Sequence, residues 1–398
     1  MIPADVLILT LWLVIAAWFG TAIVITVEFY ARARQEARSA RLLEQLTAAP
    51  FAIESLPEVS RGEFQELVLA GLPHPAQVAL AQTLRAHGGD QALVALVSGA
   101  KRGSLEERIA ALHVLVSGRH PEMYQVLAGA LRSAEGELAA VALRLLRGLD
   151  DVDAANVLVG ALAGKHQPPS RIASALDQMT VKYGHLLGAL LQHRDSTVRF
   201  WSLLLVGRTA AGQWIWTVRS LLTDREPMVR RAAVEALGRL GAPEDRRLVL
   251  ARFFDPAPMV RVHAARAAAA FADAGVANAL AKLLSDREWI VRSAARDALR
   301  AMGRVATPAV IHTLWHGDAF AANNAAEVLF LTGDTLEMVR AALTRPDGGD
   351  RTALVQRLLA SSGPHLVRAV QDQLDPAQHA QLDRLIAARD AFASVRRG

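Results

Sequence analysis

The sequence of 398 residues contains no cysteine, and lysine is nearly absent: 44 basic residues include only Lys101, Lys165, Lys182 and Lys282, so that arginine supplies the rest. The absence of cysteine excludes disulfide bonds, thiolate metal sites and a thiol nucleophile. The sequence also lacks a long basic run, because 39 carboxylates are interleaved with the arginines. This pattern is typical of a solvated mixed-charge surface and makes a nucleic-acid partner the less favoured interpretation.

Motifs that would indicate catalysis are also missing. The sequence contains no Gly-x-Ser-x-Gly elbow and no His-Glu-x-x-His helix, and its paired glycines follow no predicted strand, as a phosphate-binding loop would require. His312 and His316 have the i, i+4 spacing of two metal ligands, with Asp318 close behind, but no third ligand is evident. We therefore predict no enzyme activity, no cofactor and no metal.

The longest uncharged segment lies at the N-terminus, between Val6 and Val27. At about 1.5 Å per residue, a helix of this length crosses a hydrocarbon core of about 30 Å. Arginines follow it from Arg32 onward, which places the C-terminal side in the cytoplasm by the positive-inside bias. We predict a single-pass membrane protein with its N-terminus outside and a cytoplasmic remainder. A cleaved signal peptide is the alternative, disfavoured by the absent basic start and the long apolar core.

Most of the remaining chain has an internal period of 31 residues. Val229, Val260 and Val291 share one phase, and each is followed by an arginine. Two helices and two turns fit in this length, and so small a unit must stack on its neighbours to bury its apolar face. The arginine phase runs, with small adjustments of loop length, through Gln77, Arg108, Ala139, Arg171, Arg199, Arg230, Arg261, Arg292, Asn323 and Arg351. We predict an all-α fold: a transmembrane helix followed by an α-solenoid of about ten helix pairs.

Apolar and small residues recur at fixed phases within this period. The second helix of each pair carries an alanine that would let neighbouring helices approach closely: Ala233, Ala264, Ala295 and Ala326. The first helix carries apolar positions that we expect to stack into buried rows: Val218, Val249 and Leu280, and then Leu222, Phe253 and Leu284. Asp224, Asp255 and Asp286 precede the second helix, where they could cap it, and Pro227 and Pro258 suit its first turn.

These observations divide the chain into four predicted segments. Residues 1–30 would form the transmembrane anchor and residues 31–62 a juxtamembrane helix with a linker. Residues 63–372 would form the solenoid. Asp375 and Pro376 would open a final helix, so residues 373–398 are assigned to a capping helix and tail.

The order of Asp, a Pro-containing turn, Val-Arg, spaced alanines and a terminal Leu-Gly resembles the short HEAT-like repeats of the phycobilisome bilin lyases. The resemblance is strongest over residues 190–305 and does not cover the apolar N-terminus. It implies a solenoid fold, a habit of binding, and Asp–Arg pairing across successive repeats. Deoxyhypusine hydroxylase is another enzyme of HEAT-like repeats, but its iron-binding His-Glu dipeptides do not occur in this sequence.

The repeated arginine has two interpretations. It could line a basic groove for an acidic partner, or it could form half of a repetitive ion-pair ladder. An Asp stands six residues before three of these arginines, which favours the ladder. Tryptophans near one turn could either pack between repeats or anchor a partner peptide. The candidate partner-binding residues are Arg199, Arg230, Arg261, Arg292, Trp214 and Trp216.

The function predicted from the sequence is a non-catalytic, membrane-tethered scaffold that binds a partner protein through the cytoplasmic solenoid. The lipid bilayer would be its second partner, and a membrane enzyme or an envelope complex the class of protein that the tether favours. Two alternatives stay open. One is a bilin-lyase-like enzyme or chromophore chaperone, and the other is a nucleic-acid-binding HEAT-like protein, which strong salt dependence would mark.

Overall fold

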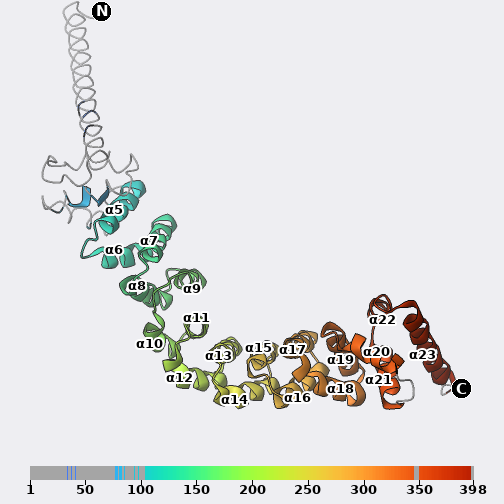
Figure 1. Ribbon diagram of the computed structural model, residues 1–398. Coiled ribbons are helices and arrows are strands. Elements are labelled where there is room, and N and C mark those ends of the chain that lie inside the picture. The colour runs from blue at the N-terminus through green and yellow to red at the C-terminus, as the bar shows by residue number, and fades with distance from the viewer. Residues whose placement is uncertain are drawn as a thin grey trace, which may run out of the picture. The chain divides into compact units, whose positions relative to one another are not determined.

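The computed structural model describes residues 104–344 and 349–395, together with single residues between 34 and 97. The chain divides into two compact units, Met1–Val181 and Lys182–Gly398, which are treated separately below. Most of each unit that is described is helical (Figure 1).

From Leu105 onward, the described part of the first unit consists of five successive helices joined by short connections. They are α5 (Leu105–Ser117), α6 (Met123–Leu131), α7 (Gly136–Leu149), α8 (Val152–Leu162) and α9 (Pro169–Asp177). Ser104 and Glu107 form a capping box at the start of α5, and Asp151 caps α8 through the Ala154 N–H. These caps satisfy main-chain donors that a helix start leaves without partners.

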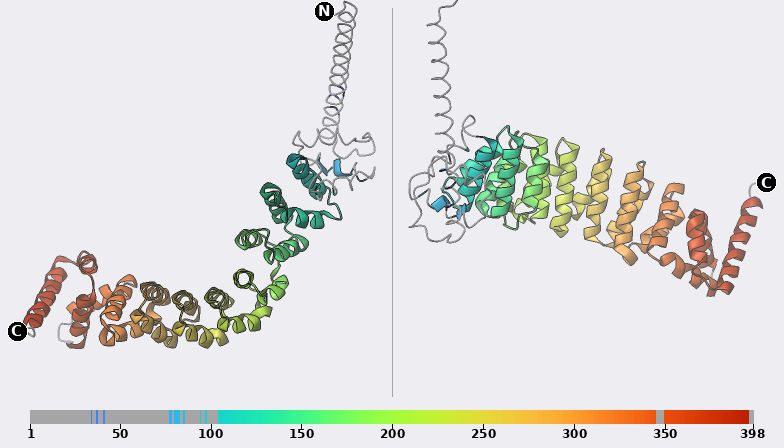
Figure 2. Two further views of the ribbon diagram at one scale, coloured as in Figure 1. Left: turned by 180° about the vertical axis from the view of Figure 1, so that it is seen from behind. Right: turned by 90° about the horizontal axis from the view of Figure 1, so that it is seen from above.

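The second unit stacks helix pairs in two rows (Figures 1 and 2). One row contains the longer helices α11 (Ser196–Arg208), α13 (Pro227–Leu240), α15 (Pro258–Ala268), α17 (Trp289–Met302) and α19 (Ala319–Leu331). The other contains α10 (Gly188–Leu191), α12 (Ile215–Ser220), α14 (Arg246–Ala251), α16 (Ala274–Lys282) and α18 (Thr307–His316). Four further helices complete the unit: α20 (Asp334–Thr344), α21 (Gly349–Ser361), α22 (Pro364–Gln371) and α23 (Pro376–Val395).

Short 3₁₀ turns flank or extend many helices of the second unit. They are η2 (Gly184–Leu187), η3 (Gly212–Trp214), η4 (Leu221–Thr223), η5 (Pro243–Asp245), η6 (Arg252–Phe254), η7 (Ala269–Phe271), η8 (Leu283–Ser285) and η9 (Gly303–Val305). The tighter turn ends a helix within two or three residues, which suits a repeat whose connections are short. The turns η4, η6 and η8 each lead directly into one of the three repeated aspartates.

The predicted repeat phase is confirmed over the described residues. The helices α5, α7, α9, α11, α13, α15, α17, α19 and α21 each begin two to four residues before one of the phase positions from Arg108 to Arg351. The predicted unit around Gln77 lies almost entirely outside the described residues. The apolar rows are buried, with at most 4% of any of their six side chains exposed, and the four aligned alanines are fully buried.

The predicted role of the prolines is confirmed, but that of the aspartates differs. Pro227 and Pro258 are the first residues of α13 and α15. Asp224, however, accepts from the Glu226 N–H, which lies before the helix, at 2.9 Å. Asp255 and Asp286 make the same contact, with the Ala257 and Glu288 N–H groups, so each aspartate stabilises the turn ahead of its helix.

Polar side chains also link successive helices of the other row and of the first unit. In each case a side chain reaches an aspartate at or near the start of the corresponding helix of the next repeat, at 2.5–2.7 Å: Tyr124 to Asp151, Arg219 to Asp245, Arg246 to Asp273 and Thr307 to Asp334. Neighbouring repeats are therefore joined by polar contacts as well as by their apolar rows.

The predicted membrane localisation is corrected by the structure. Within residues 104–344 and 349–395, no helix is both long enough and apolar enough to cross a bilayer. The longer helices from α5 to α19 have at most 14 residues, about 21 Å of rise, and the longer α23 carries charges such as Asp383 and Arg384. The segment from Val6 to Val27 lies outside the described residues. The transmembrane anchor and the cytoplasmic placement derived from it are therefore not retained.

Close packing of the aligned alanines generates a prediction about stability. Ala295→Leu in α17 should lower the free energy of unfolding by about 1–3 kcal/mol, because the added carbon atoms have no space between neighbouring helices. Ala301→Leu, at an exposed position of the same helix, should change it by less than about 0.5 kcal/mol. Urea unfolding followed by circular dichroism measures both values, and equal effects of the two substitutions would contradict the packing interpretation.

Candidate functional site

Three arginines of the long helices bind the aspartate of the following repeat in the same geometry. The Arg199 Nε and Nη2 atoms each donate to the Asp224 carboxylate at 2.9 Å. Two further pairs repeat this arrangement at 2.8–2.9 Å: Arg230 with Asp255, and Arg261 with Asp286. We call these three pairs the Arg–Asp ladder. Both oxygens of each carboxylate are engaged, as in the strongest form of this ion pair.

The third guanidinium nitrogen of each arginine, Nη1, binds main-chain oxygens of its own repeat. The Arg230 Nη1 atom donates to the main-chain oxygens of Asp224 and Arg225, at 2.9 and 3.2 Å. The corresponding atoms of Arg199 and Arg261 donate to oxygens at the same offsets. Each guanidinium therefore fixes the turn before its own helix and the turn of the next repeat.

The ladder is largely removed from water. Arg199, Arg261 and Asp255 are buried, and Asp224 and Asp286 are mostly covered. Burial on its own would raise the pKa of each carboxyl, but hydrogen bonds from the arginine and from a main-chain N–H outweigh it, so the pKa values of all three aspartates are lowered. The carboxylates thus stay charged at neutral pH.

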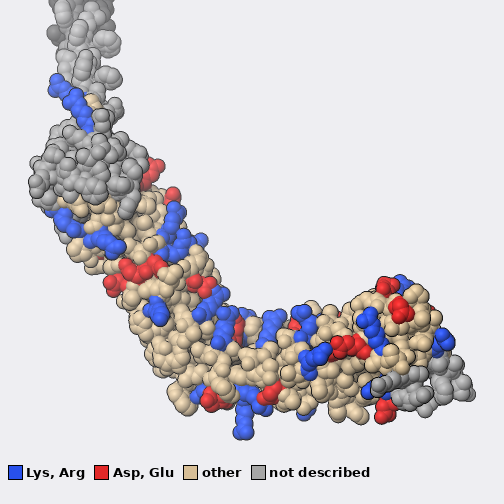
Figure 3. All heavy atoms as spheres, in the orientation of Figure 1, with Lys and Arg blue, Asp and Glu red and all other residues tan. Residues whose placement is uncertain are grey.

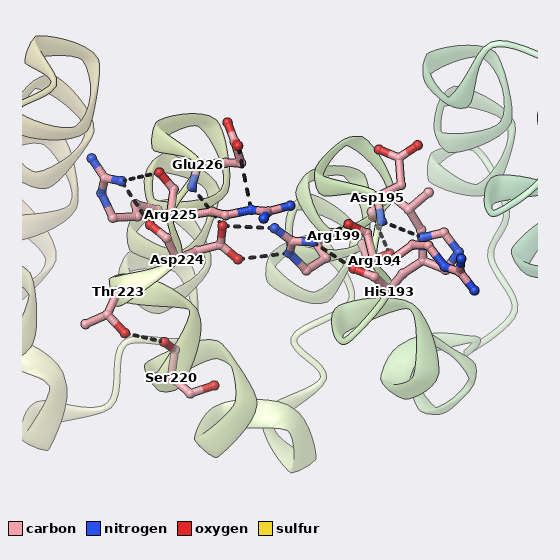
Figure 4. Close-up of polar contacts among 12 residues, drawn as sticks. His193, Arg194, Asp195, Arg199, Ser220, Thr223, Asp224, Arg225 and Glu226 are labelled. Carbon is pink, nitrogen blue, oxygen red and sulfur yellow. Dashed lines mark hydrogen bonds and ion pairs between the residues drawn. The ribbon is translucent and has the colours of Figure 1, made fainter.

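A groove of about 780 Å³ lies beside the first pair of the ladder, Arg199 with Asp224. Figure 4 shows this pair and the polar contacts around it. One wall consists of the segment from Leu191 to Arg194 with Arg199, and the other is formed by α12 and the turn that contains Asp224 and Arg225. The Arg199–Asp224 pair joins the two walls, so their separation is fixed by a buried bidentate contact. We call this cavity the Trp216 groove, after its largest exposed side chain.

Trp216 lines the groove and has 75% of its surface exposed. The guanidinium carbon of Arg219 lies 4.6 Å from the centre of its ring, within the range of a cation–π contact. Arg219 in turn donates to the fully buried Asp245 at 2.6 Å. One face of the indole is thus supported by a fixed cation while much of its surface stays open to solvent.

Trp214 has a different position, although it was predicted together with Trp216. Its Nε1 atom donates to the Gly184 main-chain oxygen at 2.8 Å, and its ring packs so closely on Gly188 that a Cβ there would lie 2.3 Å from it. Trp214 therefore holds η2 and α10 against the next repeat. Neither this difference nor the role of Arg219 was evident from the sequence, because both depend on how the turn η3 and the short helix α12 are oriented toward the neighbouring repeat.

The structure also places the two histidines considered as metal ligands. His312 and His316 lie together on α18, with their ring centres 4.6 Å apart. Among the residues that the structure describes, no three side chains of the metal-ligating types gather at one point. The pair therefore has no described third ligand.

The stacked helix pairs and the ladder that joins them define this part of the chain as an α-solenoid. Its repeats are HEAT repeats: the family model described as HEAT repeats matches residues 185–253 and 247–330. No curated protein sequence matches the chain significantly. The comparisons do not support the narrower likeness to phycobilisome bilin lyases.

Several solved structures are similar to this chain. An engineered protein is 19% identical, with 81% of this chain and 98% of that protein covered and a TM-score of 0.37. Kap95 in complex with Nup1 is 12% identical, with 80% and 55% covered and a TM-score of 0.44. Kap121p bound to Nup53p is 13% identical, with 80% and 45% covered and a TM-score of 0.40. This chain therefore spans about half the length of the two Kap proteins.

The ladder generates a prediction about stability. Arg230→Ala should lower the free energy of unfolding by about 3–5 kcal/mol, because it leaves the buried Asp255 charge without its partner. Arg225→Ala removes an arginine that is 81% exposed and should cost less than about 0.5 kcal/mol. Urea unfolding at pH 7 measures both, and a loss for Arg230→Ala no larger than for the control would show that the ladder adds no stability.

The lowered pKa of Asp255 also predicts a dependence on pH. A carboxyl whose pKa is lower in the folded state stabilises the fold above its unfolded pKa of about 4, and this contribution is lost as pH falls through the folded value. Without Arg230, burial raises that pKa and reverses the trend. The difference in stability between the wild type and Arg230→Ala should therefore narrow from pH 6 to pH 3 in urea unfolding, and a constant difference would contradict this linkage.

Proposed function

We propose that the protein is a non-catalytic scaffold whose HEAT-repeat surface binds a partner protein, with the Trp216 groove as a principal contact. The observation that carries this proposal is an exposed indole, held in place by Arg219, at the edge of a groove with rigid walls. Large aromatic side chains with few rotamers are the residues that most often dominate binding energy at protein interfaces.

The chemistry of the groove favours a polypeptide. It combines the indole with Ser220 and Thr217 hydroxyls and with the exposed cations Arg194 and Arg225, whereas the Asp224 charge is neutralised by Arg199. An apolar side chain of the partner would cover the indole, and its polar or acidic neighbours would meet the hydroxyls and arginines. Because the ladder fixes both walls before binding, little conformational entropy would be lost there.

The nucleic-acid alternative has less support. Three of the four repeated arginines use all three of their guanidinium nitrogens on aspartates and main-chain oxygens, and so have little left to offer to phosphates. Basic and acidic side chains are also interleaved along the face of the second unit seen in Figure 3. The four arginines predicted as groove residues therefore have different positions. Arg199 lines the Trp216 groove in a structural role, Arg230 and Arg261 belong to the ladder, and Arg292 is considered below.

A photo-crosslinking experiment tests the proposal. A benzophenone amino acid replaces the exposed Ser220 in the groove, the full chain is irradiated in the source cells, and covalent adducts are identified by mass spectrometry. We expect one recurrent polypeptide adduct, reduced at least tenfold by Trp216→Ala, because truncation removes the anchor.

Two controls make this result specific to the groove. Phe254→Ala removes a side chain that is 85% exposed but does not line the groove, and it should leave the adduct unchanged. A benzophenone at exposed Ala301 of α17 should not yield the same adduct. An adduct that is insensitive to Trp216→Ala, or the absence of any polypeptide adduct, would contradict the proposal.

A further inference from the structure

The Arg–Asp ladder stops at Arg292, whose position in α17 is equivalent to those of the three ladder arginines. The Arg292 Nη1 atom donates to the main-chain oxygens of Asp286 and Arg287 at 2.8 and 3.2 Å, as its counterparts do in earlier repeats. No carboxylate of the described residues lies within ion-pair distance of its Nε and Nη2 atoms. We call this pair of donors the open fork.

The missing carboxylate has a simple cause in the sequence. One period after Asp286 stands Gly317, which has no side chain to offer. Nor does its turn have room for one, since a Cβ there would lie 2.6 Å from the Thr313 main-chain oxygen and 2.8 Å from the Ala321 Cβ. The chain therefore does not fill the fork from the position that fills the other three.

Two acidic residues close in sequence to the turn and to Arg292 have other partners. Asp318 caps α19, where its Oδ1 atom accepts from the Ala321 N–H at 2.8 Å. Glu288 pairs with its neighbour Arg287 at 3.8 Å on the surface. The fork is consequently oriented by two main-chain oxygens, and it has no internal anion.

Near the fork, aromatic residues stand in place of the prolines of earlier repeats. Trp289 and Phe320 stand one and two periods after Pro258, and they lie at the starts of α17 and α19, which pack side by side. They are 68% and 65% exposed. The Phe320 ring centre lies 5.2 Å from the Arg292 guanidinium carbon, within the range of a cation–π contact, and Arg292 is only half-buried.

We propose that the open fork binds a side-chain carboxylate of a partner polypeptide, and that Phe320 and Trp289 hold an apolar residue next to it. The protein itself shows the bound geometry, because the same fork binds aspartate at 2.8–2.9 Å in three preceding repeats. A planar, pre-oriented guanidinium selects a carboxylate by two parallel hydrogen bonds. This inference rests on the proposed function and adds a second contact with a defined partner chemistry: an acidic residue beside an apolar one.

Short synthetic peptides test the proposal on the full chain. The probes are fluorescent nonapeptides with Gly-Ser flanks, an amidated C-terminus and one central pair: Phe-Asp, Leu-Asp, Phe-Glu or Leu-Glu. Their partners contain Asn or Gln in place of the acid. Fluorescence anisotropy should show at least one acidic peptide binding about tenfold or more tightly than its amide partner, since only a carboxylate accepts from both donors.

Variants of the chain assign this discrimination to the fork. Arg292→Ala should abolish it, and Arg292→Lys, which keeps the charge but not the planar fork, should lose most of it. Phe320→Ala should weaken every acidic peptide severalfold, whereas Arg300→Ala, an exposed arginine of the same helix, should change nothing. Circular dichroism verifies that each variant is folded.

The outcomes separate this proposal from the preceding one. No preference for acid over amide in the wild type, or a preference that survives in both Arg292 variants, would overturn it. Trp216→Ala should keep the preference, because the Trp216 groove and the fork share no residue. A failed crosslink in the groove together with a retained acid preference would therefore refute the groove alone.

Discussion

Each arginine of the ladder joins its own helix to two turns through one planar group. Its Nη1 atom fixes the turn before its own helix, and its Nε and Nη2 atoms fix the turn of the next repeat, as between Arg230 and Asp255. A repeat protein has few contacts between distant parts, so its geometry depends on how neighbouring units are joined. Apolar rows supply most of the burial energy, but they do not orient a unit as a bidentate pair does.

This constraint determines which side chains are available to a partner. Three of the repeated arginines are used in joining repeats, although their exact spacing resembles a binding surface. The side chains proposed for recognition deviate from the repeat: Trp216 on a short helix, and Trp289 and Phe320 where earlier repeats carry serine or proline. The proposed contacts therefore fall on departures from the consensus, because the consensus positions are occupied by packing and by the ladder.

The end of the ladder illustrates the same principle. Arg292 retains the main-chain contacts that orient its guanidinium, but Gly317 replaces the aspartate that would complete the pair. The oriented Arg292 guanidinium is thus present without an aspartate partner, near the exposed rings of Trp289 and Phe320. The energy that orders the donors comes from the fold itself, so a ligand would meet a site that is already organised.

The sequence alone determined the helix-pair period, the buried rows and the place of each long helix, because one strict spacing repeats in Val229, Ala233 and their equivalents and leaves one packing that buries them all. It also indicated a ladder of Asp and Arg. The family resemblance implied pairing across repeats, but only the tertiary structure showed that each arginine reaches the aspartate 25 residues later, since the six-residue spacing by itself equally fits contact within one repeat. It likewise decided that Trp214 is a packing residue and Trp216 an exposed one, because the turn η3 and the helix α12 direct them to different sides and periodicity does not specify which side faces a neighbour.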